Sequence, residues 1–193
     1  MARAGRLRVI AGSAGGRRLV APAGTDVRPT TDRVKESVFA ALGDERLRGA
    51  VVLDLYAGSG ALAIEALSRG ADRAVLVDRE HAAVDAMERN VDVTGLAERA
   101  RVQRGEVAAF VRRRPPAEAP FDLVLLDPPY DLPRAELEGV LDRLAGPGWL
   151  ASGATVVVEQ GTREPPAALP EQWAITWERG YGDTLVVVAS THD

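Results

Sequence analysis

The spacing of apolar residues along the chain predicts a sheet built from repeated strand–helix units. After residue 50, short apolar runs typical of buried strands alternate with segments in which apolar residues recur every three or four positions, as in amphipathic helices. Such alternation predicts a parallel sheet with helices on both faces. We expect strands at 51–56, 73–78, 101–104, 121–127 and 155–159, and helices at 61–69, 81–94, 107–114 and 134–144.

The last part of the chain departs from this alternation. Two strand-like runs, Ala174 to Glu178 and Leu185 to Ala189, flank a turn that contains two glycines. This arrangement predicts a hairpin that adds an antiparallel strand to the sheet. The expected fold is therefore an α/β fold with a mostly parallel sheet whose last strand is antiparallel.

The first 50 residues predict a smaller unit ahead of the sheet. Leu7 to Ala11 and Arg17 to Ala21 surround a glycine-rich loop, which is typical of a β-hairpin. A helix is expected next, because residues 30–32 supply capping side chains and the following apolar residues share one helical face. We therefore expect a basic hairpin extension at 1–29 and a larger domain at 30–193.

Composition narrows the classes of protein that remain. The chain has 193 residues, 46% hydrophobic and 27% charged, which suits one folded domain with an extension rather than a disordered chain. No apolar run approaches the roughly 18 residues of a membrane-spanning helix, and no signal-peptide core is present, so we expect a cytoplasmic protein without a membrane partner. Zero cysteines and two histidines exclude disulfides, thiolate metal sites and a cysteine nucleophile, and we expect no metal.

Charge is divided unevenly along the chain. Residues 1–36 contain eight basic and three acidic residues, whereas the remainder contains 16 basic and 25 acidic residues. The overall net charge of −4 therefore combines +5 in the first part with −9 in the second. A basic segment on an acidic body is typical of a protein that binds a polyanion at one end, although a solvated tail would carry the same charge.

The first motif with chemical content follows the strand at 51–56 and opens the next helix. Gly58 and Gly60 allow a tight turn and a close approach of a ligand to the backbone, as in nucleotide-binding proteins. Asp54 precedes Gly58 by four residues and would repel a pyrophosphate but attract a cation. S-adenosylmethionine suits this pattern, because it carries an ammonium and a sulfonium and no phosphate. A structural turn without a ligand is the alternative.

Two further acidic residues stand at the ends of the next strands. Asp78 follows Gly60 by 18 residues, a spacing at which a carboxylate accepts hydrogen bonds from ribose hydroxyls in both nicotinamide and S-adenosylmethionine sites. Glu106 and Val107 stand where an adenine would lie, the first to accept from its amine and the second to cover its ring. Both acids also fit a simpler role at the start of a helix.

The most specific motif is Asp127-Pro128-Pro129-Tyr130, which ends a buried strand at the edge where ligands bind open α/β sheets. Two consecutive prolines have no N–H donors, so the turn presents acceptors, chiefly the Asp127 carboxylate and the Pro128 carbonyl. An exocyclic NH₂ group matches these acceptors, which would favour positive charge on a nitrogen that attacks a methyl group. Tyr130 supplies a flat face on which a base can stack. A rigid loop with an incidental acid is the alternative.

These motifs, in this order, resemble class I S-adenosylmethionine-dependent methyltransferases that act on an amino nitrogen. The segments 8–12, 16–19 and 28–39, with Tyr181-Gly182-Asp183-Thr184, are similar to the RsmD family, and the resemblance covers essentially the whole chain. It implies a Rossmann-like, seven-stranded sheet and methyl transfer to N2 of one guanine in bacterial 16S ribosomal RNA. The RNA partner would be free or part of a small ribosomal subunit, and we expect a monomeric enzyme.

The candidate site residues follow from the motifs and from this resemblance. We expect the catalytic site, which holds the target base, to contain Asp127, Pro128 and Tyr130. The expected cofactor-binding residues are Asp54, Tyr56, Gly58, Gly60, Asp78, Arg79, Glu106 and Val107. The expected RNA-binding residues are Arg6, Arg8, Arg17, Arg18, Arg28, Arg33 and Lys35. The family position of Glu106 is often Asp or Asn, so its role in contacting adenine is left open.

Other functions remain open from the sequence. An adenine-N6 DNA methyltransferase or a glutamine-N5 protein methyltransferase would use the same acceptors, but the first usually has a sizeable target-recognition region and the second does not need a basic segment. A non-enzymatic RNA-binding module explains the basic segment but not the four motifs. A nicotinamide-dependent oxidoreductase explains the glycines and Asp78 but gives Asp127 to Tyr130 no role.

Overall fold

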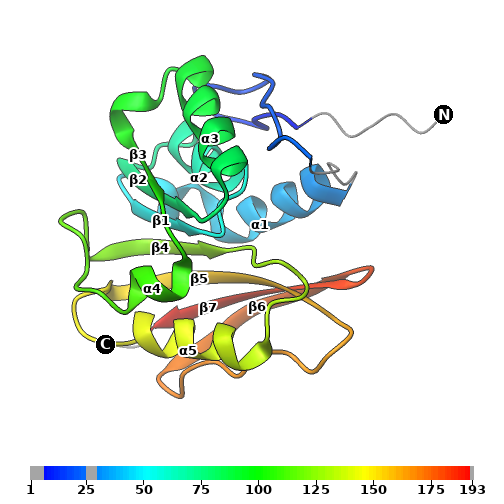
Figure 1. The fold of residues 1–193 in the computed structure, drawn as a ribbon, viewed down its shortest axis with the longest axis vertical. Coiled ribbons are helices and arrows are strands. Elements are labelled where there is room, and N and C mark those ends of the chain that lie inside the picture. Colours follow the sequence, from blue (N-terminus) through cyan, green and yellow to red (C-terminus); the bar gives the residue numbers. More distant parts are fainter. Residues whose placement is uncertain (1–6, 25–29, 192–193) are drawn as a thin grey trace.

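In the computed structural model, which describes residues 7–24 and 30–191, the chain forms a sheet of seven strands (Figure 1). The strand order is β3-β2-β1-β4-β5-β7-β6, and the pairs from β3 to β5 are parallel. β7 is antiparallel to both neighbours, which confirms the predicted antiparallel last strand. The strands are β1 Val51–Leu55, β2 Arg73–Asp78, β3 Ala100–Arg104, β4 Phe121–Leu126, β5 Leu150–Gly161, β6 Trp173–Tyr181 and β7 Thr184–Thr191.

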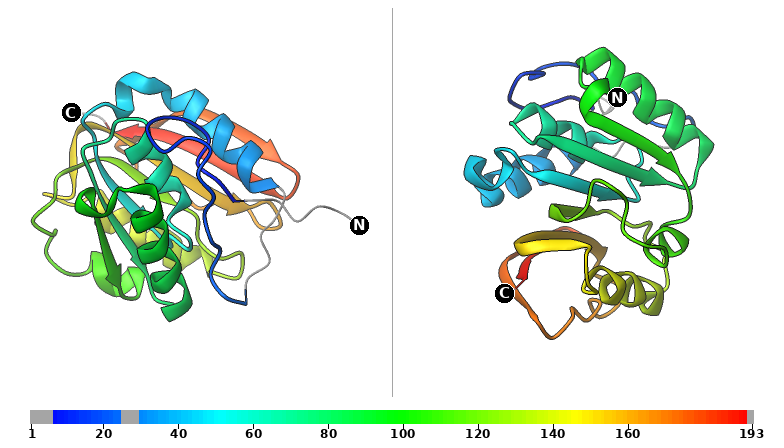
Figure 2. Two further views of the ribbon diagram at one scale, coloured as in Figure 1. Left: turned by 90° about the horizontal axis from the view of Figure 1, so that it is seen from above. Right: turned by 90° about the vertical axis from the view of Figure 1, so that its left-hand side faces the viewer.

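Helices cover both faces of this sheet. α1, α2 and α3 lie on one face, and α4 and α5 lie on the other (Figures 1 and 2). Gly43 interrupts α1, because its φ of 70° and ψ of 158° are not helical, and the helix then continues to Leu47. None of the described helices is both long and apolar enough to span a membrane. The helices are α1 Thr30–Leu47, α2 Ala61–Ser68, α3 His81–Thr94, α4 Val107–Val111 and α5 Arg134–Leu144, with a 3-10 helix at Ala97–Arg99.

Successive residues of the central strands enter two different hydrophobic clusters. In β1, Val52 packs with α1, α2 and α3, whereas Leu53 and Leu55 pack with α4 and α5. Burial on both faces explains why these strands are almost continuously apolar, as is usual in parallel sheets. Asp54 is the exception in β1, and because side chains alternate, it points to the same face as Val52.

β5 is longer than the sequence predicted. We expected a strand at 155–159, whereas β5 begins at Leu150 and ends at Gly161. Its pairing with β4 changes register in the region that contains the exposed Ser152 and Gly153, and these two residues obscure the strand pattern. The additional length at the other end carries β5 to the edge of the sheet where the predicted site lies.

The basic N-terminal segment is part of the folded core from residue 7 to residue 24. Leu19 N–H donates to the Leu7 carbonyl at 2.9 Å, and an isolated bridge joins Arg8 to Arg18, so the hairpin path is present but the two predicted strands are not. Leu7, Val9 and Leu19 are buried in the cluster with α1, α2 and α3. A solvated tail is therefore wrong for this segment, while the predicted boundary after residue 29 stays a prediction.

Candidate active site

Three aspartates gather at the carboxyl edge of the sheet. Their strands are neighbours in the order β2-β1-β4, and all three strands run in the same direction. Asp54 lies next to the last residue of β1, Asp78 ends β2, and Asp127 follows β4 directly. The site expected from separate sequence motifs therefore forms at one edge, as is usual for ligand sites in open α/β sheets.

Asp54 is the most deeply buried of these acids, with 1% of its surface exposed. Its Oδ2 accepts a hydrogen bond from Ala63 N–H of α2 at 3.1 Å. The pKa of Asp54 is raised to about 8, chiefly by burial and also by the nearby carboxylates of Asp127 and Asp78, while the Ala63 hydrogen bond opposes the shift. A cationic ligand beside Asp54 would favour its ionised form.

The loop between β1 and α2 has a left-handed backbone that opens space for a ligand. Tyr56, Gly58 and Gly60 have φ values of 59°, 55° and 73°. A Cβ atom at Gly60 would lie 2.7 Å from a Leu76 methyl group, whereas Gly58 has open space around the same position. Asp78 fixes the loop, because its Oδ2 accepts from Gly58 N–H at 2.9 Å.

A cavity of about 170 Å³ connects this loop to the Asp127–Tyr130 loop. We call it the inner cavity. It brings Asp54, Tyr56 and Gly58, predicted to bind the cofactor, together with Asp127 and Tyr130, predicted to bind the target base. Its lining is Val34, Lys35, Asp54, Tyr56, Ala57, Gly58, Ser59, Ala61, Leu62, Asp127, Tyr130, Glu159, Asp183 and Thr184.

Tyr130 is held by two residues, Thr184 and Gly161, for which the sequence analysis predicted no role. Its hydroxyl and Thr184 Oγ1 lie 2.7 Å apart and share a hydrogen bond, and half of its surface is exposed. The ring also lies against the end of β5, because a Cβ atom at Gly161 would approach Tyr130 Cδ1 to 2.9 Å. In the sequence, the one signal for these contacts was the motif Tyr181-Gly182-Asp183-Thr184. This motif contributed to the family resemblance, but no role was predicted for its residues.

Several predicted cofactor residues lie outside the inner cavity. Asp78 and Gly60 support the loop from behind, and the exposed Arg79 pairs with Glu80 at 2.9 Å. Glu106 is exposed at the start of α4, beside the end of β2, so its contact with adenine stays a prediction. The prediction that Val107 covers a ligand ring is corrected, because its side chain is buried in the α4–α5 cluster.

Pro128, unlike Asp127 and Tyr130, does not line the inner cavity. It is buried and lines a neighbouring cavity rather than the inner cavity. Its position directly after Asp127 keeps its backbone carbonyl in the same turn. The acceptor role of that carbonyl therefore stays a prediction.

The predicted RNA-binding residues divide into an exposed group and one buried residue. Arg8, Arg17, Arg18 and Arg33 are exposed, although Arg17 also donates to the Val93 carbonyl at 2.6 Å. Arg6 and Arg28 lie outside the described residues.

Lys35 corrects the prediction, because only 1% of its side chain is exposed and it cannot meet a phosphate at the surface. Its Nζ donates to the Arg8 carbonyl and lies 3.9 Å from Glu65 Oε2 and 3.8 Å from Asp32 Oδ1. Burial lowers the pKa of Lys35, and the carboxylates of Glu65 and Asp32 oppose this shift. Lys35 therefore supports the backbone of the basic segment from inside.

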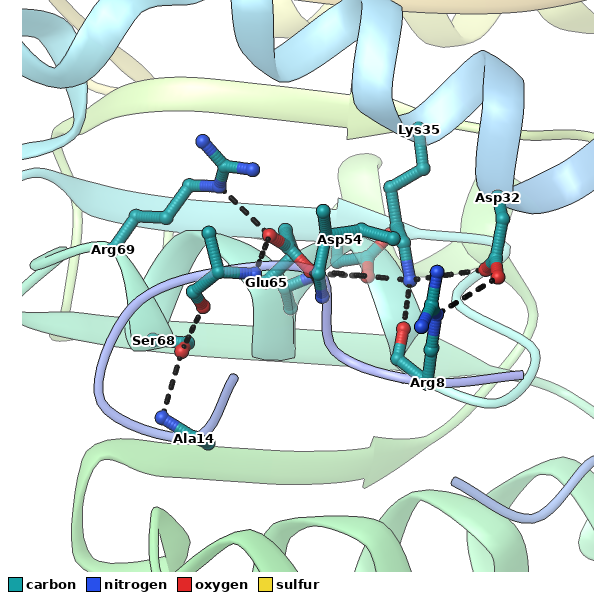
Figure 3. Close-up of polar contacts among 11 residues, drawn as sticks. Arg8, Ala14, Asp32, Lys35, Asp54, Glu65, Ser68 and Arg69 are labelled. Carbon is teal, nitrogen blue, oxygen red and sulfur yellow. Dashed lines mark hydrogen bonds and ion pairs between the residues drawn. The ribbon is translucent and has the colours of Figure 1, made fainter. Parts of the chain in front are cut away.

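Glu65 of α2 is the centre of this support (Figure 3). Its fully buried carboxylate accepts from Ile10 N–H at 2.6 Å and from Ala11 N–H at 3.0 Å, and it pairs with Arg69 Nε at 2.7 Å. Ser68 completes the contact, because its Oγ accepts from Ala14 N–H at 2.9 Å. The basic segment is therefore bound through its backbone to α2. This helix begins directly after the loop that contains Gly58 and Gly60, which we call the glycine loop.

Asn90 of α3 links the other arm of the segment to the same loop. Its side chain is fully buried, its Oδ1 accepts from Val20 N–H at 2.8 Å, and its Nδ2 donates to the Val20 carbonyl at 2.8 Å. The same Nδ2 donates to the Ser59 carbonyl at 2.9 Å. Because Ser59 lines the inner cavity, Asn90 joins the cavity wall to the basic segment.

Comparison with known proteins places this arrangement in a family. A family model described as "Conserved hypothetical protein 95" matches residues 7–190. The chain is 35% identical over 178 residues to Ribosomal RNA small subunit methyltransferase D of Escherichia coli K12. The aligned region covers 92% of this chain and 86% of that protein. The chain belongs to the RsmD family. The Haemophilus influenzae protein of the same name is 32% identical over 92% of this RsmD-family chain and 90% of its own length.

A solved structure supports the same placement. The structure of yhhF from Escherichia coli superposes with a TM-score of 0.84 at 34% identity, and the match covers 97% of this chain and 99% of that one. The RsmD-family chain therefore has the class I methyltransferase fold.

The residues of this RsmD-family site fit the cofactor of class I methyltransferases, S-adenosylmethionine. The buried Asp54 carboxyl group suits a cationic group, and the open space at Gly58 allows a ligand to reach the loop. The Tyr56 hydroxyl is buried and has no hydrogen-bond partner among the described residues. Within the same residues, no cluster of histidine and carboxylate side chains is suited to hold a metal ion.

Replacement of Asp54 by Asn is expected to stabilise the ligand-free protein while weakening ligand binding. The pKa of Asp54 is near 3.8 when unfolded and about 8 when folded, so its contribution to stability is fully present below pH 4 and is lost as pH rises toward 8. Asp54→Asn lacks this loss, and its stability relative to the wild type should increase from pH 5 to pH 8. Urea unfolding at both pH values measures this difference.

The matched control for this comparison is Asp142→Asn, at an exposed position of α5. It should show no such pH-dependent difference from the wild type. Affinity for S-adenosylhomocysteine, measured by calorimetry, should fall at least tenfold in Asp54→Asn and remain unchanged in Asp142→Asn. A constant stability difference across this pH range would contradict the raised pKa of Asp54.

Replacement of Gly161 by Ala is expected to displace Tyr130 without disturbing the glycine loop. The backbone of Gly161 is not left-handed, so the close approach of the new methyl group to Tyr130 Cδ1 is the main consequence. Methyl transfer should fall at least tenfold, while binding of S-adenosylhomocysteine should not change. Gly180→Ala in β6 is the control, because a Cβ atom there has open space; equal rates for the two variants would show that Gly161 does not fix the ring.

Proposed function

We propose that this protein transfers a methyl group from S-adenosylmethionine to the exocyclic N2 amine of a guanine in small-subunit ribosomal RNA. The observation that carries the proposal is the inner cavity, which the buried Asp54 and the Asp127–Tyr130 loop line together. The curated relatives named Ribosomal RNA small subunit methyltransferase D support the substrate class. Free 16S RNA and an assembled or assembling subunit are both substrates compatible with the site.

The cofactor half of the site is the glycine loop and Asp54. S-adenosylmethionine supplies an electrophilic methyl group on a sulfonium. Asp54 would provide the negative charge that matches its cationic end, and Gly58 would allow the close approach. Asp78 would accept from ribose hydroxyls in addition to Gly58 N–H, since a carboxylate has capacity for further hydrogen bonds.

The target half of the site is the Asp127–Tyr130 loop. The Asp127 carboxylate and the Pro128 carbonyl accept hydrogen bonds from the guanine N2 amine, which orients its lone pair and stabilises the positive charge that develops on nitrogen. Tyr130, fixed by Thr184 and Gly161, stacks on the base after it leaves its helical stack. The methylated amine is acidic, so Asp127 or water takes its proton without the need for a strong base.

The exposed arginines of the basic segment place the RNA relative to this cavity. Arg8, Arg17, Arg18 and Arg33 contact phosphates, and such contacts fix position rather than sequence. Between Arg8 and Arg17, the backbone N–H groups of Ile10 and Ala11 are held to α2 by Glu65, so this part of the RNA-facing surface is attached to the helix that begins at the glycine loop. We assign Arg6 and Arg28 the same role by their charge.

The function itself is tested by mapping the modified nucleotides of 16S RNA from a deletion strain by mass spectrometry. One guanine should lack its methyl group and regain it when the wild-type gene is restored. Purified enzyme should methylate the same guanine in naked RNA or in small subunits, offered separately. An unchanged methylation pattern in the deletion strain would refute the assignment to ribosomal RNA.

Replacement of Asp127 by Ala is expected to reduce turnover at least a hundredfold, because one of the two acceptors for the amine is lost. Binding of S-adenosylhomocysteine should persist, since Asp54 and the glycine loop are unchanged. Asp131→Ala is the control, because Asp131 is an exposed acid of the same loop. Single-turnover methylation assays separate these effects, and a rate near that of the wild type in Asp127→Ala would remove Asp127 from the mechanism.

Removal of Arg17 and Arg18 is expected to weaken the salt dependence of RNA binding. Each lost phosphate contact should reduce the slope of log K against log salt concentration by about 0.7–0.9. Affinity for S-adenosylhomocysteine should remain the same. Arg143→Ala, on α5 at the opposite face of the sheet, is the control and should leave the slope unchanged; an unchanged slope in the double variant would place RNA elsewhere.

A further inference from the structure

A second, larger cavity adjoins the inner cavity at Tyr130. It has a volume of about 400 Å³ and lies between the loop after β4, the start of α5 and the connection from β5 to β6. Tyr130 and Asp183 line both cavities, so the two spaces meet at these side chains. We call this space the outer cavity. The sequence motifs predicted no ligand for this second space, although Pro128, Pro129 and Tyr130 of the Asp127–Tyr130 motif line it.

The wall of the outer cavity is fixed by hydrogen bonds from two different elements. Glu138 of α5 accepts from Ala168 N–H at 2.9 Å and from Arg134 Nε at 2.7 Å, and these contacts lower the pKa of Glu138. Gln160 Oε1 at the end of β5 accepts from Ala167 N–H at 2.9 Å. The segment that closes the cavity is therefore attached to α5 and to β5, and the space is formed before any ligand binds.

The lining combines an apolar surface with groups that match a nucleotide. Leu137 and Ala167 are buried and supply apolar contact suited to a flat ring. Arg163 and Glu164 are exposed at the cavity, where a guanidinium can meet a phosphate and a carboxylate can accept from a base amine. Arg134 adds a second guanidinium group, whose Nε donates a hydrogen bond to Glu138.

We infer that the outer cavity binds the base of a nucleotide directly adjacent to the target guanine in the same RNA strand. This inference rests on the proposed function. A guanine in the inner cavity is joined by phosphodiester linkages to neighbours that must pass close to Tyr130, and the outer cavity opens at that residue. The site therefore reads two consecutive nucleotides, and the outer one contributes to the selection of the target.

The test uses short RNA substrates that contain the target guanine with a single abasic nucleotide on its 5′ or its 3′ side. For the wild-type enzyme, one of the two abasic substrates should lose roughly tenfold or more in kcat/KM, which is the range expected for one stacked base. The other abasic substrate should lose much less. Equal kcat/KM values for the intact RNA and both abasic RNAs would overturn the inference.

A comparison of enzyme variants on intact and abasic RNA connects the loss of kcat/KM to the outer cavity. Arg163→Ala combined with Glu164→Ala changes only exposed side chains, so the variant is expected to fold. It should lower kcat/KM for intact RNA but no longer distinguish the sensitive abasic substrate from intact RNA. Arg143→Ala, outside the cavity, should retain the wild-type distinction. Full retention of the distinction in the double variant would overturn the assignment to the outer cavity.

Two results separate this inference from the proposed function. If the wild-type enzyme binds S-adenosylhomocysteine but methylates none of the guanine-containing RNAs, the proposed function fails and the outer cavity loses its proposed ligand. If the wild-type enzyme methylates all three RNAs equally, the proposed function stands and the adjacent-nucleotide site alone is refuted.

Discussion

The site depends on the burial of the Asp54 carboxyl group next to two other aspartates. Burial raises its pKa to about 8, and Asp127 and Asp78 add to the shift. A group of this kind disfavours the folded state at neutral pH, whereas a bound cation would favour its ionised form. The unfavourable electrostatics of the ligand-free edge would thus be the source of the proposed preference for a cationic ligand. A neutral residue that stabilises the fold in place of Asp54 would remove that preference.

The helix α2 joins this electrostatic site to the basic segment. In its first turn, Ala63 N–H donates a hydrogen bond to Asp54, and its next turn presents the buried Glu65 to Ile10 and Ala11. Loss of the Glu65 carboxylate would leave the partly buried N–H groups of Ile10 and Ala11 without this acceptor, at a cost of up to about 1–3 kcal/mol each. The basic segment is therefore positioned mainly by its backbone, although two of its exposed arginines also make structural contacts: Arg17 donates to the Val93 carbonyl, and Arg8 pairs with Asp32 at 3.5 Å.

The fold and the members of the inner cavity were predictable because they rest on local patterns. Strand–helix alternation and the residues at strand ends determine the sheet edge, and Asp54, Gly58, Asp127 and Tyr130 meet there. The roles of Lys35, Val107 and Thr184 were not predictable, because they depend on contacts between residues distant in the chain. A lysine in a basic segment has the same sequence pattern whether it faces RNA or a buried glutamate, and only packing against Glu65 separates the two.

Selection of a substrate requires more than the acceptors of the Asp127–Tyr130 loop. These acceptors match the amine of guanine, the amine of adenine and the amide of glutamine equally well, since each offers two N–H donors. Discrimination must therefore come from contacts beyond the reacting nitrogen. In the proposed function, the exposed arginines would give a preference for a polyanion, and the outer cavity would add a surface suited to a second flat ring near the target. Because Tyr130 borders both cavities, the side chain proposed to stack on the target base would also limit where an adjacent base can lie.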